Sequence, residues 1–278
     1  MLAADYAISR IRRDLTLGAF VRFLLLGAAL ACLLVGPFVS TGALSGFALM
    51  MIGVIWLALS FRSARSSQMA QMSSSLIATG QWERAEQQIE QSLRTFSLYR
   101  TNKLLSLHHL ALLRHAQNRY QESALLCRAL LGQRLGRMNA LSKSSRLILA
   151  DALLEMGDVR GAYDAFIRLH DERLSLGEAV QLLVIEMDYG SRVGAWAHML
   201  ESLMTKVQLA ELMPTQSAAT VQALLALAAK KLDRIDISEW LKRRAELLVD
   251  AEELVRSKPV LRELFEKHRS QEPEARSQ

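Results

Sequence analysis

The chain has 278 residues, of which 51% are hydrophobic and only four are proline, so it is long enough for one or two domains with a well-packed core. The formal net charge is +6, but residues 1–65 carry six arginines against two aspartates, which leaves only +2 on the rest of the chain. This distribution disfavours a nucleic-acid-binding protein, which needs a basic face on its folded domain. The two cysteines, Cys32 and Cys127, indicate neither a disulfide framework nor a zinc site.

A basic N-terminus, residues 1–18, precedes two charge-free apolar runs, Phe23–Val39 and Ala43–Phe61. The second run has 19 residues, and a helix of that length spans about 28 Å, close to the thickness of the bilayer core. We therefore expect two transmembrane helices within residues 19–61, joined by the short connection GPFVSTG.

Arginines flank this hairpin on both sides, and the connection between the two runs has none. The positive-inside rule then places both chain ends in the cytoplasm. The sequence thus predicts a two-pass integral membrane protein, for which the lipid bilayer is one partner. A cleavable signal peptide that ends near Val39 is the alternative interpretation of the first run.

A short pattern recurs after the second apolar run. The stretch GQWERAEQQIEQSL is followed by the similar stretches NRYQESALLCRALL, GDVRGAYDAFIRL, GSRVGAWAHMLESL and DRIDISEWLKRRAEL. A small residue stands five positions after each start and, in four of the five copies, another stands seven positions before it. Two antiparallel helices joined by a tight turn can approach closely where small residues meet. The five copies start at Gly80, Asn118, Gly157, Gly190 and Asp233.

This pattern resembles the tetratricopeptide repeat (TPR), a helix–turn–helix unit of about 34 residues, over roughly Arg65–Leu248. The resemblance implies an all-α fold in which a TPR-like α-solenoid of helix pairs, residues 62–248, follows the transmembrane helical hairpin. We expect a C-terminal capping helix at 249–268, kinked or split by Pro259, and a disordered tail at 269–278. In an alternative arrangement, the last helix folds back into the groove of the solenoid.

No motif for catalysis stands out, because the chain lacks a phosphate-binding glycine-rich loop, a Gly-x-Ser-x-Gly sequence and a His-Glu-x-x-His sequence. His108, His109 and His115 fall on one predicted helix without the spacing of a helical metal pair, and we interpret them as a polar helix face. The run HDER at 170–173 is expected to cap or solvate a helix end. We expect no catalytic, cofactor-binding or metal-binding residue, no cofactor and no enzyme activity. A basic stretch is interpreted as a solvated loop, with contact to anionic lipid headgroups as the alternative; it comprises Arg134, Arg137, Lys143 and Arg146.

In the resembled family, the first helix of each pair lines a concave groove that binds peptides or protein segments. The corresponding residues here do not form the carboxylate clamp of some members, and the lining is mainly apolar. It would receive an apolar partner segment or be filled by the chain's own helices. The expected groove residues are Ala70, Ser74, His108, Leu112, His115, Leu147, Asp151, Val180, Val184 and Leu227.

The resulting hypothesis is a membrane-anchored helical-repeat scaffold that mediates protein–protein interactions at the cytoplasmic face. Its partner would be an unidentified protein or peptide segment, and no nucleic acid is expected. Two alternatives remain open: a non-catalytic accessory subunit of a membrane enzyme or transport complex, and an RNA-binding helical array.

Overall fold

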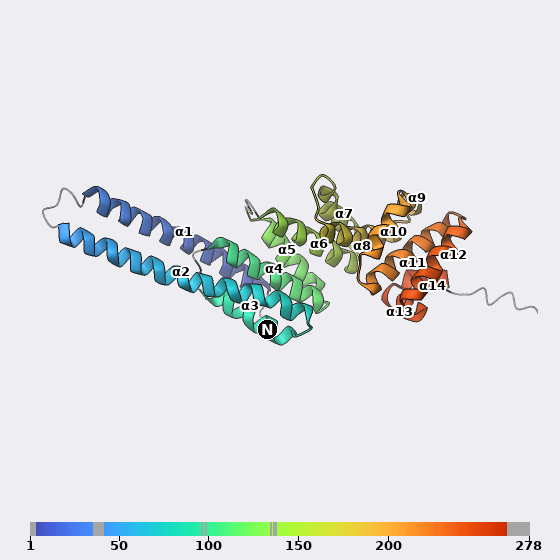
Figure 1. Cartoon of the computed structure of the whole chain (residues 1–278), viewed down its shortest axis with the longest axis horizontal. Helices are drawn as coiled ribbons and strands as arrows, with labels where there is room; N and C mark the ends of the chain where they lie inside the picture. Colours follow the sequence, from blue (N-terminus) through green and yellow to red (C-terminus); the bar gives the residue numbers. More distant parts are fainter. Residues whose placement is uncertain are drawn as a thin grey trace, which may run out of the picture. The chain divides into compact units, whose positions relative to one another are not determined.

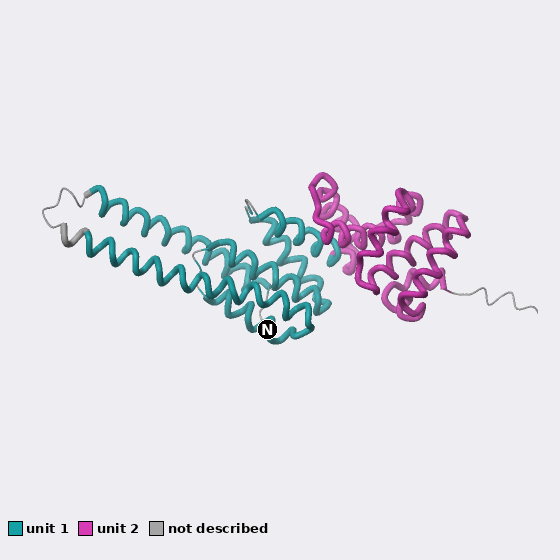
Figure 2. Tube along the Cα trace, viewed as in Figure 1, with its two compact units in different colours: residues 1–152 teal, residues 153–278 magenta. Residues whose placement is uncertain are grey.

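The computed structural model describes residues 4–35, 42–95, 97, 99–133, 135 and 138–265. Every regular element in these ranges is a helix (Figure 1), which confirms the expected all-α class. The chain divides into two compact units, Met1–Ala152 and Leu153–Gln278, which Figure 2 distinguishes by colour. We describe each unit by itself.

Unit 1 begins with two long helices, α1 (Ala4–Val35) and α2 (Gly42–Ala78), which pack against each other (Figure 1). Both are long and apolar enough to cross a membrane. Large apolar side chains on them are exposed, for example Phe23 (78%) and Phe61 (75%). Exposed apolar surface of this extent is unusual on a protein that is surrounded by water alone.

Neither long helix stops at the boundaries expected from the sequence. The basic N-terminal segment is the first half of α1, and Ala7 and Ile11 of this half are buried against the rest of unit 1. Helix α2 continues without a break past the expected domain boundary at residue 61 to Ala78, which agrees with the absence of Gly and Pro between Gly53 and Gly80. The predicted division at residues 18 and 61 therefore separates stretches of different polarity within continuous helices.

The rest of unit 1 consists of shorter helices. Helix α3 packs against α2, α4 packs against α3, and α5 packs against α4. Helix α6 begins in unit 1 and ends at the start of unit 2. Their bounds are α3 Trp82–Arg94, α4 Arg100–Ala116, α5 Tyr120–Leu131 and α6 Asn139–Glu155.

Unit 2 is organised around α11 (Thr215–Lys231), whose residues from Ala218 to Ala229 are all buried. Helices α8, α9, α10 and α12 pack on it. The remaining elements are short. The bounds are α7 Val159–Phe166, η2 Ile167–Leu169, α8 Leu176–Val193, α9 Trp196–Leu200, α10 Leu203–Glu211, α12 Ile235–Leu248, α13 Ala251–Ser257, η3 Pro259–Leu261 and α14 Arg262–Phe265.

One turn geometry recurs along the chain. Five of the six described residues with φ in the left-handed region are Gly80, Asn118, Gly157, Gly194 and Asp233. They follow one another at intervals of 38, 39, 37 and 39 residues. At each, the next residue's N–H donates to the carbonyl five positions before it, at 2.8–2.9 Å. This is the Schellman-type helix end, and Gly, Asn and Asp are the residues that tolerate it best.

The fourth predicted copy was placed four residues too early. The turn is at Gly194, whereas Gly190 lies inside α8. A Cβ atom on Gly190 would lie 2.7 Å from Cγ of Met199, so this glycine serves the close approach of α8 and α9 rather than a turn. Ala195, predicted at a helix crossing, is instead the N-cap of α9.

At the other four copies, the small residues five positions after the turn are buried: Ala85, Ser123, Ala162 and Ser238. The two serines make the same contact. Ser123 Oγ donates to the Ala111 carbonyl and Ser238 Oγ to the Ala226 carbonyl, both at 2.9 Å. In each case a serine at the start of one helix meets an alanine of the preceding helix.

The C-terminal helix expected from the sequence is split at Pro259 into α13, η3 and α14. Leu254, Leu261 and Leu264 of these pieces are buried, and all three pieces pack on α11. The end of the expected helix at 266–268 and the expected disordered tail at 269–278 lie outside the described residues.

Candidate functional site

Unit 2 contains a pocket of about 460 Å³ that is lined by parts of α7, η2, α8, α9 and α10. One wall is a cluster of three aromatic rings. Tyr163 stacks on Tyr189 with centroids 5.5 Å apart, and Phe166 meets Tyr189 edge-on at 5.3 Å. Each ring thus lies within the range of a favourable aromatic pair. Met187, Gly190, Ala195 and Met199 also line the pocket, so its surface is mainly apolar.

Four acidic or basic side chains line the same pocket, those of His170, Glu186, His198 and Lys206. His170 Nε2 lies 3.0 Å from Glu186 Oε1. Lys206 Nζ donates to the carbonyls of His198 and Met199, both at 3.0 Å, and so satisfies the C-terminal end of the short helix α9. An apolar pocket with a few convergent polar groups is the usual form of a ligand or side-chain binding site.

The surroundings shift the pKa values of two of these groups. Burial raises the pKa of the Glu186 carboxyl, and the neighbouring His170, Lys206 and His198 oppose this rise. Burial lowers the pKa of the Lys206 ammonium, and Glu186 and Glu201 oppose this fall. Burial thus disfavours the charged form of each group, which is common among the residues of binding sites.

The local sequence places these groups through helical spacing. Tyr163 and Phe166 are three residues apart and share one face of α7, while Glu186 and Tyr189 share one face of α8. Helices α7 and α8 pack against each other, which brings the two faces together. His170 is the C-cap of η2, as expected for a residue at a helix end, and its side chain also pairs with Glu186. None of these residues was among the predicted site residues, although the aromatic spacing in GAYDAFIRLH was a signal for them.

Seven of the ten predicted groove residues lie in unit 1. Ala70, His108 and Leu147 are buried, whereas Leu112 is half-buried and Ser74 is exposed. The carbonyl of Ala70 accepts a hydrogen bond from His109 Nδ1 at 2.7 Å. The side chains of His115 and Asp151 come together, with 2.9 Å between Nε2 and Oδ2.

The other three lie in unit 2. Leu227 is fully buried in α11, and Val180 and Val184 are half-buried against the same core. Ala70, His108, Leu147 and Leu227 are thus part of the packing between helices. In this structure their side chains lie in the interior of the units rather than on an open groove.

His108 and His109 are also explained by packing. His108 Nδ1 lies 2.9 Å from Ser145 Oγ, and burial lowers the pKa of His108 to about 4, with His109 contributing a smaller repulsion. No group of three or more His, Cys, Asp or Glu side chains within the described ranges could hold a metal ion. In the predicted basic stretch, Arg134 and Arg137 lie outside the described residues, and Lys143 and Arg146 lie on α6.

No family model matches this sequence, and no curated protein and no solved structure matches it significantly.

Proposed function

We propose that the chain is a membrane-anchored scaffold of TPR-like helix hairpins, stacked as an α-solenoid, that binds a protein or peptide segment at the cytoplasmic face and catalyses no reaction itself. The observation that carries this proposal is the recurrence of one left-handed turn at intervals of 37–39 residues. Arrays of helix hairpins with a constant period present extended surfaces to other proteins.

The anchor is supported by the dimensions of the exposed apolar surface. On α1 this surface extends from Leu17 to Leu34, and the helix covers about 27 Å from Leu17 to Val35. On α2 the helix covers about 29 Å from Gly42 to Phe61. Both lengths suit a bilayer core of about 30 Å. The arginines on either side of this hairpin favour a topology with both chain ends in the cytoplasm.

The contacts of α1 argue for retention of this helix rather than cleavage as a signal peptide. Asp14 lies 2.8 Å from the ammonium of Lys103, whose side chain is only 1% exposed. Cleavage near Val39 would remove Asp14 and leave a buried lysine without its carboxylate, which is costly.

The aromatic pocket of unit 2 is the part of the scaffold that we assign to partner binding. Its apolar lining suits a large apolar side chain of the partner. Glu186, held incompletely solvated beside His170, suits a neighbouring lysine or arginine of the same segment. Apolar anchors with a charged neighbour are typical of the residues that dominate protein interfaces.

Site-specific photo-crosslinking in the native membrane tests this proposal. A photoreactive phenylalanine at Tyr163, which lines the pocket, should crosslink to a protein, and the same probe at Trp240, equally exposed but outside the pocket, should not. Glu186→Lys should abolish the crosslink from position 163. Crosslinks of equal yield from both positions, or a crosslink unaffected by Glu186→Lys, would contradict the assignment.

The same experiment separates the alternatives. A stoichiometric membrane enzyme or transporter in the crosslinked product would favour the accessory-subunit function. Nuclease-sensitive products would favour the RNA-binding array.

A further inference from the structure

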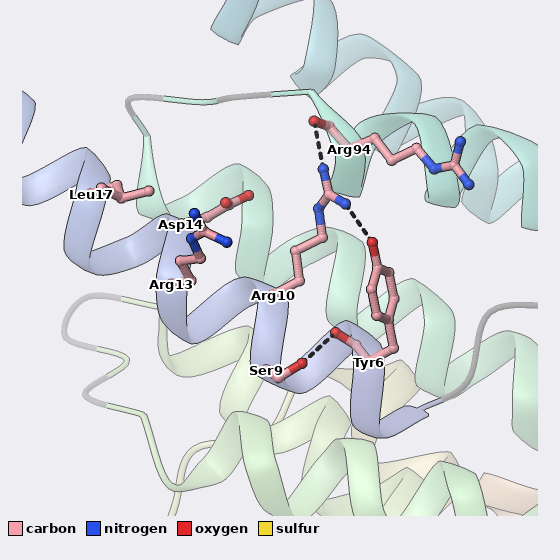
Figure 3. A pocket seen from close by; sticks show the side chains of 7 residues that line it. All are labelled: Tyr6, Ser9, Arg10, Arg13, Asp14, Leu17 and Arg94. Atoms are coloured by element: carbon pink, nitrogen blue, oxygen red, sulfur yellow. Dashed lines mark hydrogen bonds between the residues drawn. The ribbon is translucent and has the colours of Figure 1, made fainter.

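A second pocket, of about 610 Å³, lies in unit 1 beside the first half of α1 (Figure 3). It is distinct from the aromatic pocket in its chemistry, because three arginines line it. The lining residues are Tyr6, Ser9, Arg10, Arg13, Asp14, Leu17 and Arg94. A smaller pocket of about 130 Å³ shares Asp14 with it and adds Arg22 and Arg100.

The pocket is electropositive despite the presence of Asp14. Asp14 Oδ2 pairs with Lys103 Nζ at 2.8 Å, so a cation inside the protein already compensates this carboxylate. Arg10 and Arg13 are then the charged side chains that α1 places at the pocket, whereas Arg94 contributes its backbone carbonyl and directs its guanidinium away, to an ion pair with Glu90 of its own helix (Figure 3). Guanidinium groups bind phosphate oxygens through paired hydrogen bonds.

Arg10 is held in place by the protein. Its Nη1 donates to the Tyr6 hydroxyl at 2.6 Å and its Nη2 to the Arg94 carbonyl at 3.3 Å, and Figure 3 shows the side chain reaching from α1 to both. Its Nε atom is buried and has no hydrogen-bond partner in the protein. A buried donor without a partner is costly, and an anion in the pocket would stabilise the charge of the guanidinium as a whole.

The position of the pocket along α1 points to the source of that anion. Leu17, which lines the pocket, also begins the series of exposed large apolar residues of α1 that ends at Leu34, and Arg22 is the only charged residue between these two. Arg13 precedes Leu17 by about one helical turn. The arginines therefore lie at the depth of the lipid headgroups once the apolar surface is in the bilayer core.

We propose that this pocket binds the phosphate of an anionic phospholipid headgroup from the cytoplasmic leaflet, with the acyl chains lying along α1 from Leu17 towards Phe20. The inference rests on the membrane anchor of the proposed function but not on its protein partner. It differs from diffuse attraction of basic residues to a membrane, because particular arginines form the site.

The test uses the full chain in detergent and two matched pairs of substitutions. Arg10→Gln with Arg13→Gln removes the two arginines of α1 that line the pocket, and Arg12→Gln with Arg84→Gln removes two exposed arginines outside the pocket. Retention of dioleoyl phosphatidylglycerol, added to the detergent together with dioleoyl phosphatidylcholine, is measured by native mass spectrometry. Because each arginine near anionic lipid contributes about 1 kcal/mol, the pocket pair should retain about 30-fold less phosphatidylglycerol, and the control pair should lose less than about twofold.

If both pairs of substitutions reduce the retention of phosphatidylglycerol equally, the proposal is wrong and the attraction is diffuse. If inorganic phosphate raises the melting temperature of the wild type as much as phosphatidylglycerol does, the occupant of the pocket is not a lipid. Alkaline carbonate extraction tests the membrane anchor independently of the pocket. The wild-type chain and both pairs should remain in the membrane pellet, and release of the wild type would instead contradict the anchor itself.

Discussion

Lys103 and Arg114 are the largest fully buried side chains in the described part of the chain, and each connects helices rather than serving a pocket. Lys103 pairs with Asp14 of α1 and donates to the Leu93 carbonyl at the end of α3. Arg114 of α4 pairs with Glu86 of α3 and Glu122 of α5. Buried charges without partners are strongly destabilising, so these contacts specify which helices pack together in unit 1.

Replacement of Lys103 by methionine should therefore destabilise unit 1. The substitution leaves Asp14 without its cation and the end of α3 without a donor. We expect a loss of about 3 kcal/mol, measured as a lower apparent melting temperature of the detergent-solubilised chain. The double substitution Asp14→Leu with Lys103→Met should recover part of the loss. An unchanged melting temperature for the single variant would contradict the role of this ion pair.

His108 should make the stability of unit 1 depend on pH. Burial holds the pKa of His108 at about 4 in the folded protein, below the value of about 6.5 in an unfolded chain. The unfolded state then binds the proton first, so this stability is fully present above about pH 6.5 and is lost as the pH falls towards 4. The loss amounts to about 3 kcal/mol. The measurement is the melting temperature of the wild type minus that of His108→Gln. This difference should become smaller as the pH falls through this window, and a difference that does not depend on pH would contradict the prediction.

At the scale of the helices, the recurring turn and the helix crossing are linked. A left-handed residue ends one helix, and five positions later a small residue allows the next helix to approach the first. The serine-to-carbonyl bonds from Ser123 and Ser238 then fix the same relative position in two separate hairpins. The recurring feature is thus defined by the left-handed backbone conformation at the turn as well as by the packing of the small residues.

Overpacking at a crossing tests this arrangement. Ala85 and Ala162 are fully buried, and leucine at either position should cost about 1–3 kcal/mol. Leucine at the exposed neighbours Gln87 and Asp164 should change stability by less than about 0.5 kcal/mol. The melting temperature of the four variants is the measurement, and similar losses at the buried and exposed positions would show that the crossings lie elsewhere.

The sequence allowed prediction of the helical class, the two apolar helices and four of the five turns. These features depend on local patterns: runs of apolar residues, and Gly, Asn or Asp where a left-handed residue is needed. The fourth turn was misplaced because Gly190 and Gly194 both fit a local pattern, and only the close approach to Met199 distinguishes them. The aromatic pocket was missed because the aromatic spacing in GAYDAFIRLH marks only the wall on α7, and only the packing of α7 on α8 adds Glu186 and Tyr189.

At the scale of the whole molecule, cysteine labelling can test the proposed topology, in which both ends of the chain lie in the cytoplasm. Both native cysteines are first replaced by alanine, although burial raises the pKa of the Cys127 thiol to about 12 and already suppresses its reactivity. A membrane-impermeant label should reach a cysteine at Thr41, in the connection outside the described residues, in intact cells. A cysteine in place of the exposed Met156 should react only after permeabilisation. The reverse pattern would place the chain ends outside.

The C-terminal pieces should be essential for unit 2, because a stack of helix pairs exposes apolar surface at its last member unless another element covers it. Leu254, Leu261 and Leu264 provide that cover on α11. Lys258 adds ion pairs to Asp188 and Glu155, both at 2.9 Å. Burial alone would lower the Lys258 pKa, but these carboxylates outweigh it and raise the pKa, so the ion pairs persist at neutral pH.

Deletion of residues 249–278 should therefore lower the melting temperature of the full chain in detergent and promote aggregation, whereas deletion of 269–278 should leave both unchanged. Because the longer deletion removes many contacts at once, a single substitution serves as the sharper test. Leu261→Asn places a polar amide at a fully buried site and should cost about 2–4 kcal/mol through lost burial and an unpaired amide. Val260→Asn, at the exposed neighbouring position, should cost less than about 1 kcal/mol. If Leu261→Asn has the same melting temperature as the wild type, the C-terminal pieces do not cover the core of unit 2.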